Sequence, residues 1–415
     1  APYEDEDRDG LSTLSGKAYI FDVTTGNLVH TIDNPDEAGN SVFTDFFGES
    51  VAISGNYAVV GARGDVSDTG RAYIFDVTTG NLVHTLENPN PSTNDWFGYS
   101  VAISGDRAIV GAVLEDDAGG ADSGKAYIFD VTTGNLLHTL DNPNAYGGST
   151  GDRFGENVSI SGNYAIVTSR YEGDADGVTS GKAYIFNVTT GNLLHTIDNP
   201  NAYGTSTSDI FGDAVAISGN YAIVGAPDED DAGGVSSGKA YIFDVTTGAL
   251  EHTLDNPNAY GGSVDDEFGK AVAISGNYAI VGAPFEDEDR SGLSTLSGKA
   301  YIFDVTTGNL VHTLDNPDEV GNSVFTDFFG QSVAMSGNYA VVGAQGDYAD
   351  TGRAYIFDVT TGNLVHTLEN PNPDFTDYFG WGVAISGGVT IVGAPYEDDA
   401  DGNDSGKVYI FTAGT

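Results

Sequence analysis

The tripeptide Tyr-Ile-Phe occurs eight times in this chain of 415 residues, and the rest of the sequence is spaced around it. Its copies begin at Tyr19, Tyr73, Tyr127, Tyr184, Tyr241, Tyr301, Tyr355 and Tyr409. Most copies belong to the longer phrase Ala-Tyr-Ile-Phe-Asp-Val-Thr-Thr-Gly. Self-similarity of this kind indicates a repeat architecture, in which each repeat is one supersecondary unit.

One repeat contains four short apolar segments, which we name A, B, C and D. In the first complete repeat they cover residues 51–54, 57–62, 72–75 and 82–86. Gly-Asn between A and B is a strong hairpin signal, and no segment has helical periodicity. Four antiparallel strands in every repeat are typical of the blades of a β-propeller.

Phe-Gly precedes strand A in seven repeats, at intervals of 50 to 61 residues, and these pairs begin at Phe47, Phe97, Phe154, Phe211, Phe268, Phe329 and Phe379. The sequence therefore predicts an all-β fold: a seven-bladed β-propeller of four-stranded antiparallel blades, closed by N-terminal strands that join the C-terminal blade. We expect one domain over 1–415, in which 1–33 supply strands C and D of the closing blade and 370–415 supply its strands A to C. The repeat units between them are 34–87, 88–141, 142–198, 199–255, 256–315 and 316–369.

The strands number one more than closure needs. Six complete sets, three C-terminal strands and two N-terminal strands make 29, whereas seven four-stranded blades use 28. Two C strands, at 18–22 and 408–411, therefore compete for one place. Either one of them frays or lies as a fifth edge strand, or a terminal strand pairs with a neighbouring molecule and builds a filament. The residues that would exchange are Tyr19, Phe21, Tyr409 and Phe411.

The formal net charge of −46 limits the partners of this chain. Nucleic acid and anionic membrane surfaces would repel it, and no stretch is long and apolar enough to insert into a membrane. We expect as partners cations, a surface protein or glycan, or further copies of the chain. A start at Ala1 without Met is typical of an exported chain after signal-peptide removal or of an excised piece, so we expect an extracellular or cell-surface location.

Acidic clusters occur in the long loops between strands B and C. Carboxylates beside glycine and backbone carbonyls suit Ca²⁺, which takes six to eight oxygen ligands. The candidate ligands are Asp174, Asp176, Asp230, Asp231, Asp399, Asp401 and Asp404. The alternative is a solvated acidic surface.

A second set of carboxylates stands two residues before every Phe-Gly. Its members are Asp45, Asp95, Asp152, Asp209, Asp266, Asp327 and Asp377. A short carboxylate at this position is expected to accept backbone N–H bonds and fix the turn into strand A. The alternative is an electronegative ring at the mouth of a central channel.

The sequence offers few candidates for catalytic residues. All seven histidines occupy one position in strand D, which favours packing between blades, since no nucleophile repeats beside them. Irregular positions are Trp96, Trp381 and the segment 168–171, and exposed aromatic side chains of this kind can stack on sugars. We therefore predict that the chain is not an enzyme, with a site at the channel mouth as the enzymatic alternative.

The phrase Phe-Gly-x-x-Val-Ala-Ile-Ser-Gly-x-Tyr-Ala-Ile-Val-Gly-Ala-Pro, at 211–227 and 268–284, resembles the FG-GAP repeat. This family includes the seven-bladed propeller of integrin alpha subunits and many prokaryotic surface proteins. In the integrin type, a calcium loop separates strands A and B, whereas here only Ser-Gly-Asn stands there, so those ligands cannot be transferred. The resemblance is to the prokaryotic short-turn variant.

Together these observations favour a non-enzymatic extracellular structural or adhesive protein, with self-assembly through the surplus strand and an acidic calcium-binding loop face. The alternative is a lectin-like or protein-binding propeller that uses its irregular loops.

Overall fold

The computed structural model describes residues 16–35, 45–116, 120–144, 151–173, 179–201, 209–230, 235–258, 265–286, 297–317, 326–397 and 406–412. The chain forms two compact units, which we call unit 1 (Ala1–Asp22 with Asn27–Gly204) and unit 2 (Val23–Gly26 with Thr205–Thr415). The helices in the described ranges are the four-residue elements α1 (Asp65–Asp68) and α2 (Asp347–Asp350). Neither is long and apolar enough to cross a membrane.

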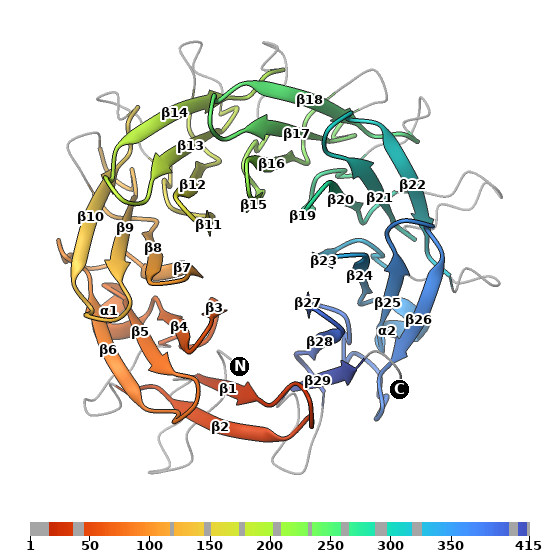
Figure 1. The fold of residues 1–415 in the computed structure, drawn as a ribbon, viewed down its shortest axis with the longest axis horizontal. Helices are drawn as coiled ribbons and strands as arrows, with labels where there is room; N and C mark the ends of the chain where they lie inside the picture. Colours follow the sequence, from red (N-terminus) through yellow and green to blue (C-terminus); the bar gives the residue numbers. More distant parts are fainter. Residues whose placement is uncertain are drawn as a thin grey trace. The chain divides into compact units, whose positions relative to one another are not determined.

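The fold is an all-β propeller with seven blades, each an antiparallel sheet whose strands follow one another along the chain (Figure 1). Six of these sheets have four strands, and the sheet formed by β27 to β29 has three. The predicted fold class is thereby confirmed, and the boundaries follow the four segments of each repeat.

Strand A is β3 (Val51–Ser54), β7 (Phe97–Ser104), β11 (Val158–Ser161), β15 (Ala214–Ser218), β19 (Ala271–Ser275), β23 (Ser332–Ser336) and β27 (Val383–Ser386). Strand B is β4 (Tyr57–Ala62), β8 (Arg107–Ala112), β12 (Tyr164–Ser169), β16 (Tyr221–Ala226), β20 (Tyr278–Ala283), β24 (Tyr339–Ala344) and β28 (Val389–Ala394). Strand C is β5 (Arg71–Asp76), β9 (Lys125–Asp130), β13 (Lys182–Asn187), β17 (Lys239–Asp244), β21 (Lys299–Asp304), β25 (Arg353–Asp358) and β29 (Lys407–Thr412). Strand D is β6 (Leu82–Glu87), β10 (Leu136–Asp141), β14 (Leu193–Asp198), β18 (Leu250–Asp255), β22 (Leu310–Asp315) and β26 (Leu364–Glu369).

The N-terminal strands β1 (Lys17–Phe21) and β2 (Leu28–Asp33) form a sheet of two strands. Tyr19 lies opposite Thr31 in this pair, so the D-type strand β2 pairs with its own C-type strand. Since β27 to β29 form a separate sheet of three, the predicted closure of the last blade by N-terminal strands is not shown.

Short polar side chains shape the turn between strands C and D. One carboxylate oxygen of Asp130 accepts hydrogen bonds from the backbone N–H groups of Thr132 and Thr133, each at 3.0 Å. The same oxygen also accepts hydrogen bonds from the hydroxyls of both threonines. These bonds favour the ionised carboxylate and lower the pKa of Asp130 to about 2. Gly134 then adopts a φ of +70°, a conformation that costs little only for glycine.

Glycine also permits the close approach of successive blades. A Cβ atom at Gly61, in the Gly-Ala of one blade, would collide with the carbonyl oxygen of Gly98, in the Phe-Gly of the next. The same contact recurs within unit 1 between Gly111 and Gly155, and within unit 2 at Gly225 with Gly269, Gly282 with Gly330 and Gly343 with Gly380. The Phe-Gly and Gly-Ala dipeptides are therefore two halves of one contact between blades.

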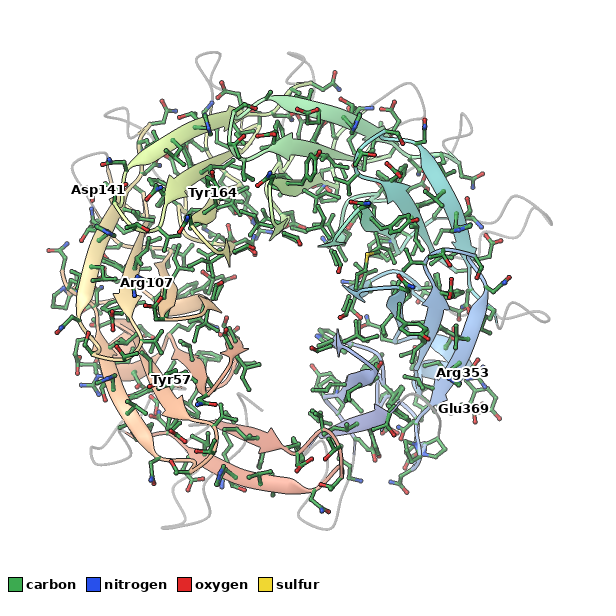
Figure 2. All side chains as sticks on the ribbon, viewed as in Figure 1. Tyr57, Arg107, Asp141, Tyr164, Arg353 and Glu369 are labelled. Atoms are coloured by element: carbon green, nitrogen blue, oxygen red, sulfur yellow. The ribbon has the colours of Figure 1, made fainter. Side chains whose placement is uncertain are left out.

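The phenylalanine of each Phe-Gly fills the core beside strand C. Phe97 is completely buried, and its ring centroid lies 5.7 Å from that of Tyr127 and 6.0 Å from that of Phe129. At the edge of the same strand, a Lys or Arg pairs with an acid at the end of strand D, as Arg353 does with Glu369 at 3.4 Å (Figure 2). The repeated Tyr-Ile-Phe thus anchors both the core and the last strand of a blade.

Candidate functional site

The predicted calcium ligands lie almost entirely outside the described residues. Only Asp230 falls within them, and its carboxylate accepts the backbone N–H of Ser236 at 2.9 Å. Asp174, Asp176, Asp231, Asp399, Asp401 and Asp404 are outside. In the described part of the chain, no three His, Cys, Asp or Glu side chains are close enough to hold a metal ion. Calcium binding therefore stays a prediction.

One glutamate in each acidic loop has a different place, buried against strand C. Glu286 is 1 % exposed and accepts the hydroxyl of Tyr301, at 2.6 and 2.8 Å to its two oxygens, and the amide of Asn258 at 2.7 Å. Burial raises the pKa of Glu286 to about 7. The corresponding tyrosine–acid pairs are Tyr127 with Glu115, Tyr184 with Glu172, Tyr241 with Glu229 and Tyr409 with Glu397.

In the two blades with short loops between strands B and C, an aspartate instead of a glutamate accepts the hydrogen bond of the tyrosine hydroxyl. Tyr73 donates its hydroxyl to Asp65, and Tyr355 donates to Asp347. Sequence reasoning grouped the corresponding glutamates with the acidic loops and did not single out Asp65 or Asp347. A usable signal was present, since the third residue after strand B is Asp or Glu in all seven repeats, whatever the length of the loop that follows.

The aspartates that precede Phe-Gly are also buried within their blades. Asp95 is 2 % exposed and accepts the side-chain amide of Asn88 at 2.9 Å and the backbone N–H of Ser92 at 2.5 Å. Burial raises its pKa to about 6. Further pairs of this kind are Asn34 with Asp45, Asn142 with Asp152, Asn256 with Asp266, Asn316 with Asp327 and Asn370 with Asp377. Asp209 is likewise buried. These contacts are those of a carboxylate that fixes a turn.

The histidines of strand D connect successive blades. His84 forms a 3.0 Å hydrogen bond between Nε2 and the carbonyl oxygen of Thr132, in the C–D turn of the next blade. Its ring lies where a Cβ atom at Gly134 would have to be. His30 and His138 make the same contact with Thr78 and Thr189.

The proposed strand-exchange residues lie in the two incomplete sheets. Tyr19 and Phe21 are on β1, with ring centroids 6.3 Å apart. Tyr409 and Phe411 are on β29 and pack on Phe379 at 5.6 and 6.0 Å. Both strands are therefore at the edge of their sheets.

Four positions directly beside these structural residues differ from repeat to repeat. They are the residue before and the residue after each Phe-Gly, and the two residues after each Gly-Ala; we call them the variable positions. Before Phe-Gly stand Phe46, Trp96, Arg153, Ile210, Glu267, Phe328 and Tyr378, and after it stand Glu49, Tyr99, Glu156, Asp213, Lys270, Gln331 and Trp381. In contrast, the contacts between blades use the same residues in most repeats.

In unit 1 the variable positions of two neighbouring blades form an arginine–aromatic stack. The guanidinium of Arg63 lies 3.7 Å from the ring centroid of Phe46 and 4.6 Å from that of Trp96. Trp96 stacks on Tyr99 with centroids 6.0 Å apart and planes 5° from parallel. Arg63 also donates to Glu49 at 2.5 Å. The cation is thus held on both sides by groups of its own chain.

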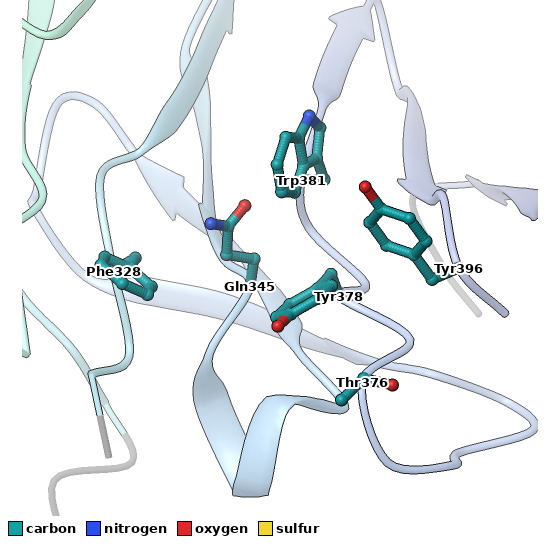
Figure 3. A pocket seen from close by; sticks show the side chains of 6 residues that line it. All are labelled: Phe328, Gln345, Thr376, Tyr378, Trp381 and Tyr396. Carbon is teal, nitrogen blue, oxygen red and sulfur yellow. The ribbon is translucent and has the colours of Figure 1, made fainter. Parts of the chain in front are cut away.

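In unit 2 five residues at variable positions, together with Thr376, surround an open hollow of about 370 Å³. Its lining consists of Phe328, Gln345, Thr376, Tyr378, Trp381 and Tyr396 (Figure 3). Trp381 is 51 % exposed, and its ring meets those of Tyr378 and Tyr396 at steep angles of 63° and 82°. Figure 3 shows Gln345 between Phe328 and Tyr378, with its amide on the side of Trp381.

Sequence reasoning identified Trp381 as irregular but missed the other residues of the hollow. A signal was available in the second, longer repeat, since residues 1–106 nearly match 283–388 with an offset of 282. Several differences between these copies fall on the variable positions: Glu49 becomes Gln331, Arg63 becomes Gln345, Trp96 becomes Tyr378 and Tyr99 becomes Trp381.

Comparison with known proteins identifies the repeat. The family model described as FG-GAP repeat matches residues 37–75, 82–129, 144–186, 201–243, 258–303, 322–357 and 365–411. Among solved structures, the crystal structure of BamB from Moraxella catarrhalis is similar, with a TM-score of 0.49 and 15 % sequence identity over 93 % of this chain and 88 % of that one. No curated protein matches the sequence.

Proposed function

Because the chain belongs to the FG-GAP repeat family, we propose that it is a non-enzymatic binding module that contacts its ligands through the variable positions. One observation carries the proposal: the repeats are nearly the same at the contacts between blades and differ at the variable positions. A rigid scaffold that presents different side chains at equivalent places is well suited to recognition. The proposal places the chain outside the cell, and the net charge of −46 argues against nucleic acid as its ligand.

The binding test uses the labelled chain on arrays of immobilised glycans and of purified cell-surface proteins. We expect at least one saturable ligand, recovered chemically unchanged by mass spectrometry, whose binding is lost in a variant with Arg63→Ala and Trp381→Ala. Glu251→Gln is the control, since Glu251 is exposed on β18 and outside the variable positions. Equal binding by the double variant, or chemical conversion of the ligand, would refute the proposal.

Self-association is a second candidate function, favoured by the two edge strands β1 and β29. An edge strand presents backbone N–H and C=O groups that can pair with another chain, and a head-to-tail pairing that does not close gives a filament. Light scattering over a concentration series and negative-stain microscopy test it. Proline at Ile20 or Ile410 should reduce the assembled fraction, and particles of a single chain at every concentration would exclude assembly.

A further inference from the structure

We propose that the hollow of unit 2 binds a neutral sugar residue of a glycan, with the sugar ring against Trp381 and its hydroxyls bonded to Gln345. This inference rests on the proposed binding function and adds the chemical class of the ligand. The hollow measures about 370 Å³, which lies in the range of about 300–1,000 Å³ found for small-molecule sites. It can therefore accept a small ring, while the rest of a glycan extends outside.

The lining of the hollow combines aromatic rings with polar groups that carry no formal charge. Four of its six residues are aromatic, and the other two are Gln345 and Thr376. A sugar ring presents apolar C–H groups on its faces and hydroxyls around its edge. The C–H face can cover the exposed part of Trp381, and the hydroxyls can reach the amide and the hydroxyls of the lining.

Gln345 supplies an independent indication of a ligand. Its side chain is 9 % exposed, and its amide oxygen has no hydrogen-bond partner among the described residues. A buried polar atom without a partner is unfavourable, and in a hollow that is open to solvent a ligand can supply the missing hydrogen bond. A sugar hydroxyl both donates and accepts, and therefore satisfies this amide in either of its two orientations.

The equivalent site in unit 1 explains why the ligand should be neutral. There, Arg63 occupies the space between the aromatic rings, and Glu49 balances its charge. In unit 2, Gln345 and Gln331 replace this pair, so the cation and its counter-charge are both absent. A cationic ligand would find no carboxylate in the lining of the hollow, whereas a neutral polyol needs none.

The two tryptophans of the chain make a direct binding assay possible. A Trp96→Phe variant keeps Trp381 as its only tryptophan, and its fluorescence is titrated with chitotetraose, cellotetraose and mannotetraose. We expect a saturable change in emission with at least one of these neutral oligosaccharides. By calorimetry, Trp381→Ala in the otherwise unchanged chain should lose affinity at least tenfold, whereas Trp96→Ala should not.

A second variant fills the hollow with a pair of side chains that already occurs at the equivalent place in unit 1. Gln345→Arg combined with Gln331→Glu restores the pair that unit 1 already carries, so the fold is expected to tolerate it, as thermal unfolding will verify. Affinity for the oligosaccharide should then fall at least tenfold. Unchanged affinity in this variant would refute the proposal, as would the absence of saturable binding to any of the three oligosaccharides.

The cation alternative is tested with the Trp96→Phe variant by titration with a tetra-arginine peptide. Saturation by this peptide but not by the oligosaccharides would overturn the sugar assignment. If the hollow fails both titrations while array ligands still depend on Arg63 and Trp381, the sugar inference fails and the binding function stands. If no array ligand depends on them either, both fail.

Discussion

Replacing the buried Glu286 by glutamine should remove a defined part of the pH dependence of stability. Glu286 accepts hydrogen bonds from Tyr301 and Asn258, and burial raises its pKa from 4.5 to about 7. Glutamine keeps one oxygen that can accept these bonds and cannot ionise. Because the carboxyl has a higher pKa in the folded than in the unfolded state, its stabilising contribution is complete below pH 4.5. That contribution is lost as the pH rises through 7.

The size of the effect follows from this difference of about 2.5 pKa units. One unit corresponds to about 1.4 kcal/mol, so the full window spans about 3 kcal/mol. Between pH 5 and pH 8, the free energy of unfolding of the wild type should therefore fall by about 2–3 kcal/mol relative to that of Glu286→Gln.

Urea unfolding followed by circular dichroism at pH 5, 6, 7 and 8 measures this difference. Glu251→Gln is the matched control, because it makes the same chemical change at an exposed side chain of β18. Its unfolding free energy should run parallel to that of the wild type. If the Glu286→Gln curve is also parallel to the wild type, the carboxyl does not titrate between these pH values, and the assigned role of burial is wrong.

Three further outcomes are expected. Gly282→Ala should destabilise the fold by several kcal/mol, since its Cβ would collide with the backbone of Gly330, whereas Gly276→Ala, with open space around it, should cost only about 1 kcal/mol of backbone strain. An equal drop in melting temperature in the two variants would contradict the proposed contact between Gly282 and Gly330. His84→Ala should lower the free energy of unfolding by about 1 kcal/mol or more, because the hydrogen bond to Thr132 is lost. An unchanged midpoint of urea unfolding would contradict a stabilising role of this bond. Millimolar Ca²⁺ should raise the melting temperature above that in equal Mg²⁺, and a chelator without effect would remove the calcium hypothesis.

The fold was predictable because the residues that build it recur in fixed order. Phe-Gly, Ser-Gly-Asn and Tyr-Ile-Phe each predict a turn or a strand from local chemistry, and their spacing places the four strands of a blade. The register of the N-terminal strands was less predictable. In the structure β2 pairs with β1, with Ile20 opposite His30. The C-type strands β1 and β29 have similar sequences, so the sequence alone does not show which of them pairs with β2.

The buried acids were harder to predict because burial is a property of the whole blade. Glu286 and Asp287 are neighbours in one acidic run, and composition alone gives no reason to separate them. Only the packing of strand C shows that the first acid faces Tyr301. Gln345 fits no motif, and its signal was the change from Arg63 between the two copies of the longer repeat.

The distribution of identical and different residues among the repeats has a physical reason. The backbone carbonyl oxygen of Gly98 lies where a Cβ atom at Gly61 would stand, so a larger residue at Gly61 would need a shift of the next blade's backbone. Every repeat has neighbours, and this requirement keeps the contact residues the same in most repeats, with Thr168 in place of the glycine in β12. Arg63 also reaches the next blade, but its partner there, Trp96, is itself at a variable position, so the two side chains can change together. Differences can therefore accumulate at the variable positions at low cost to stability, which is why we look there for what the chain recognises.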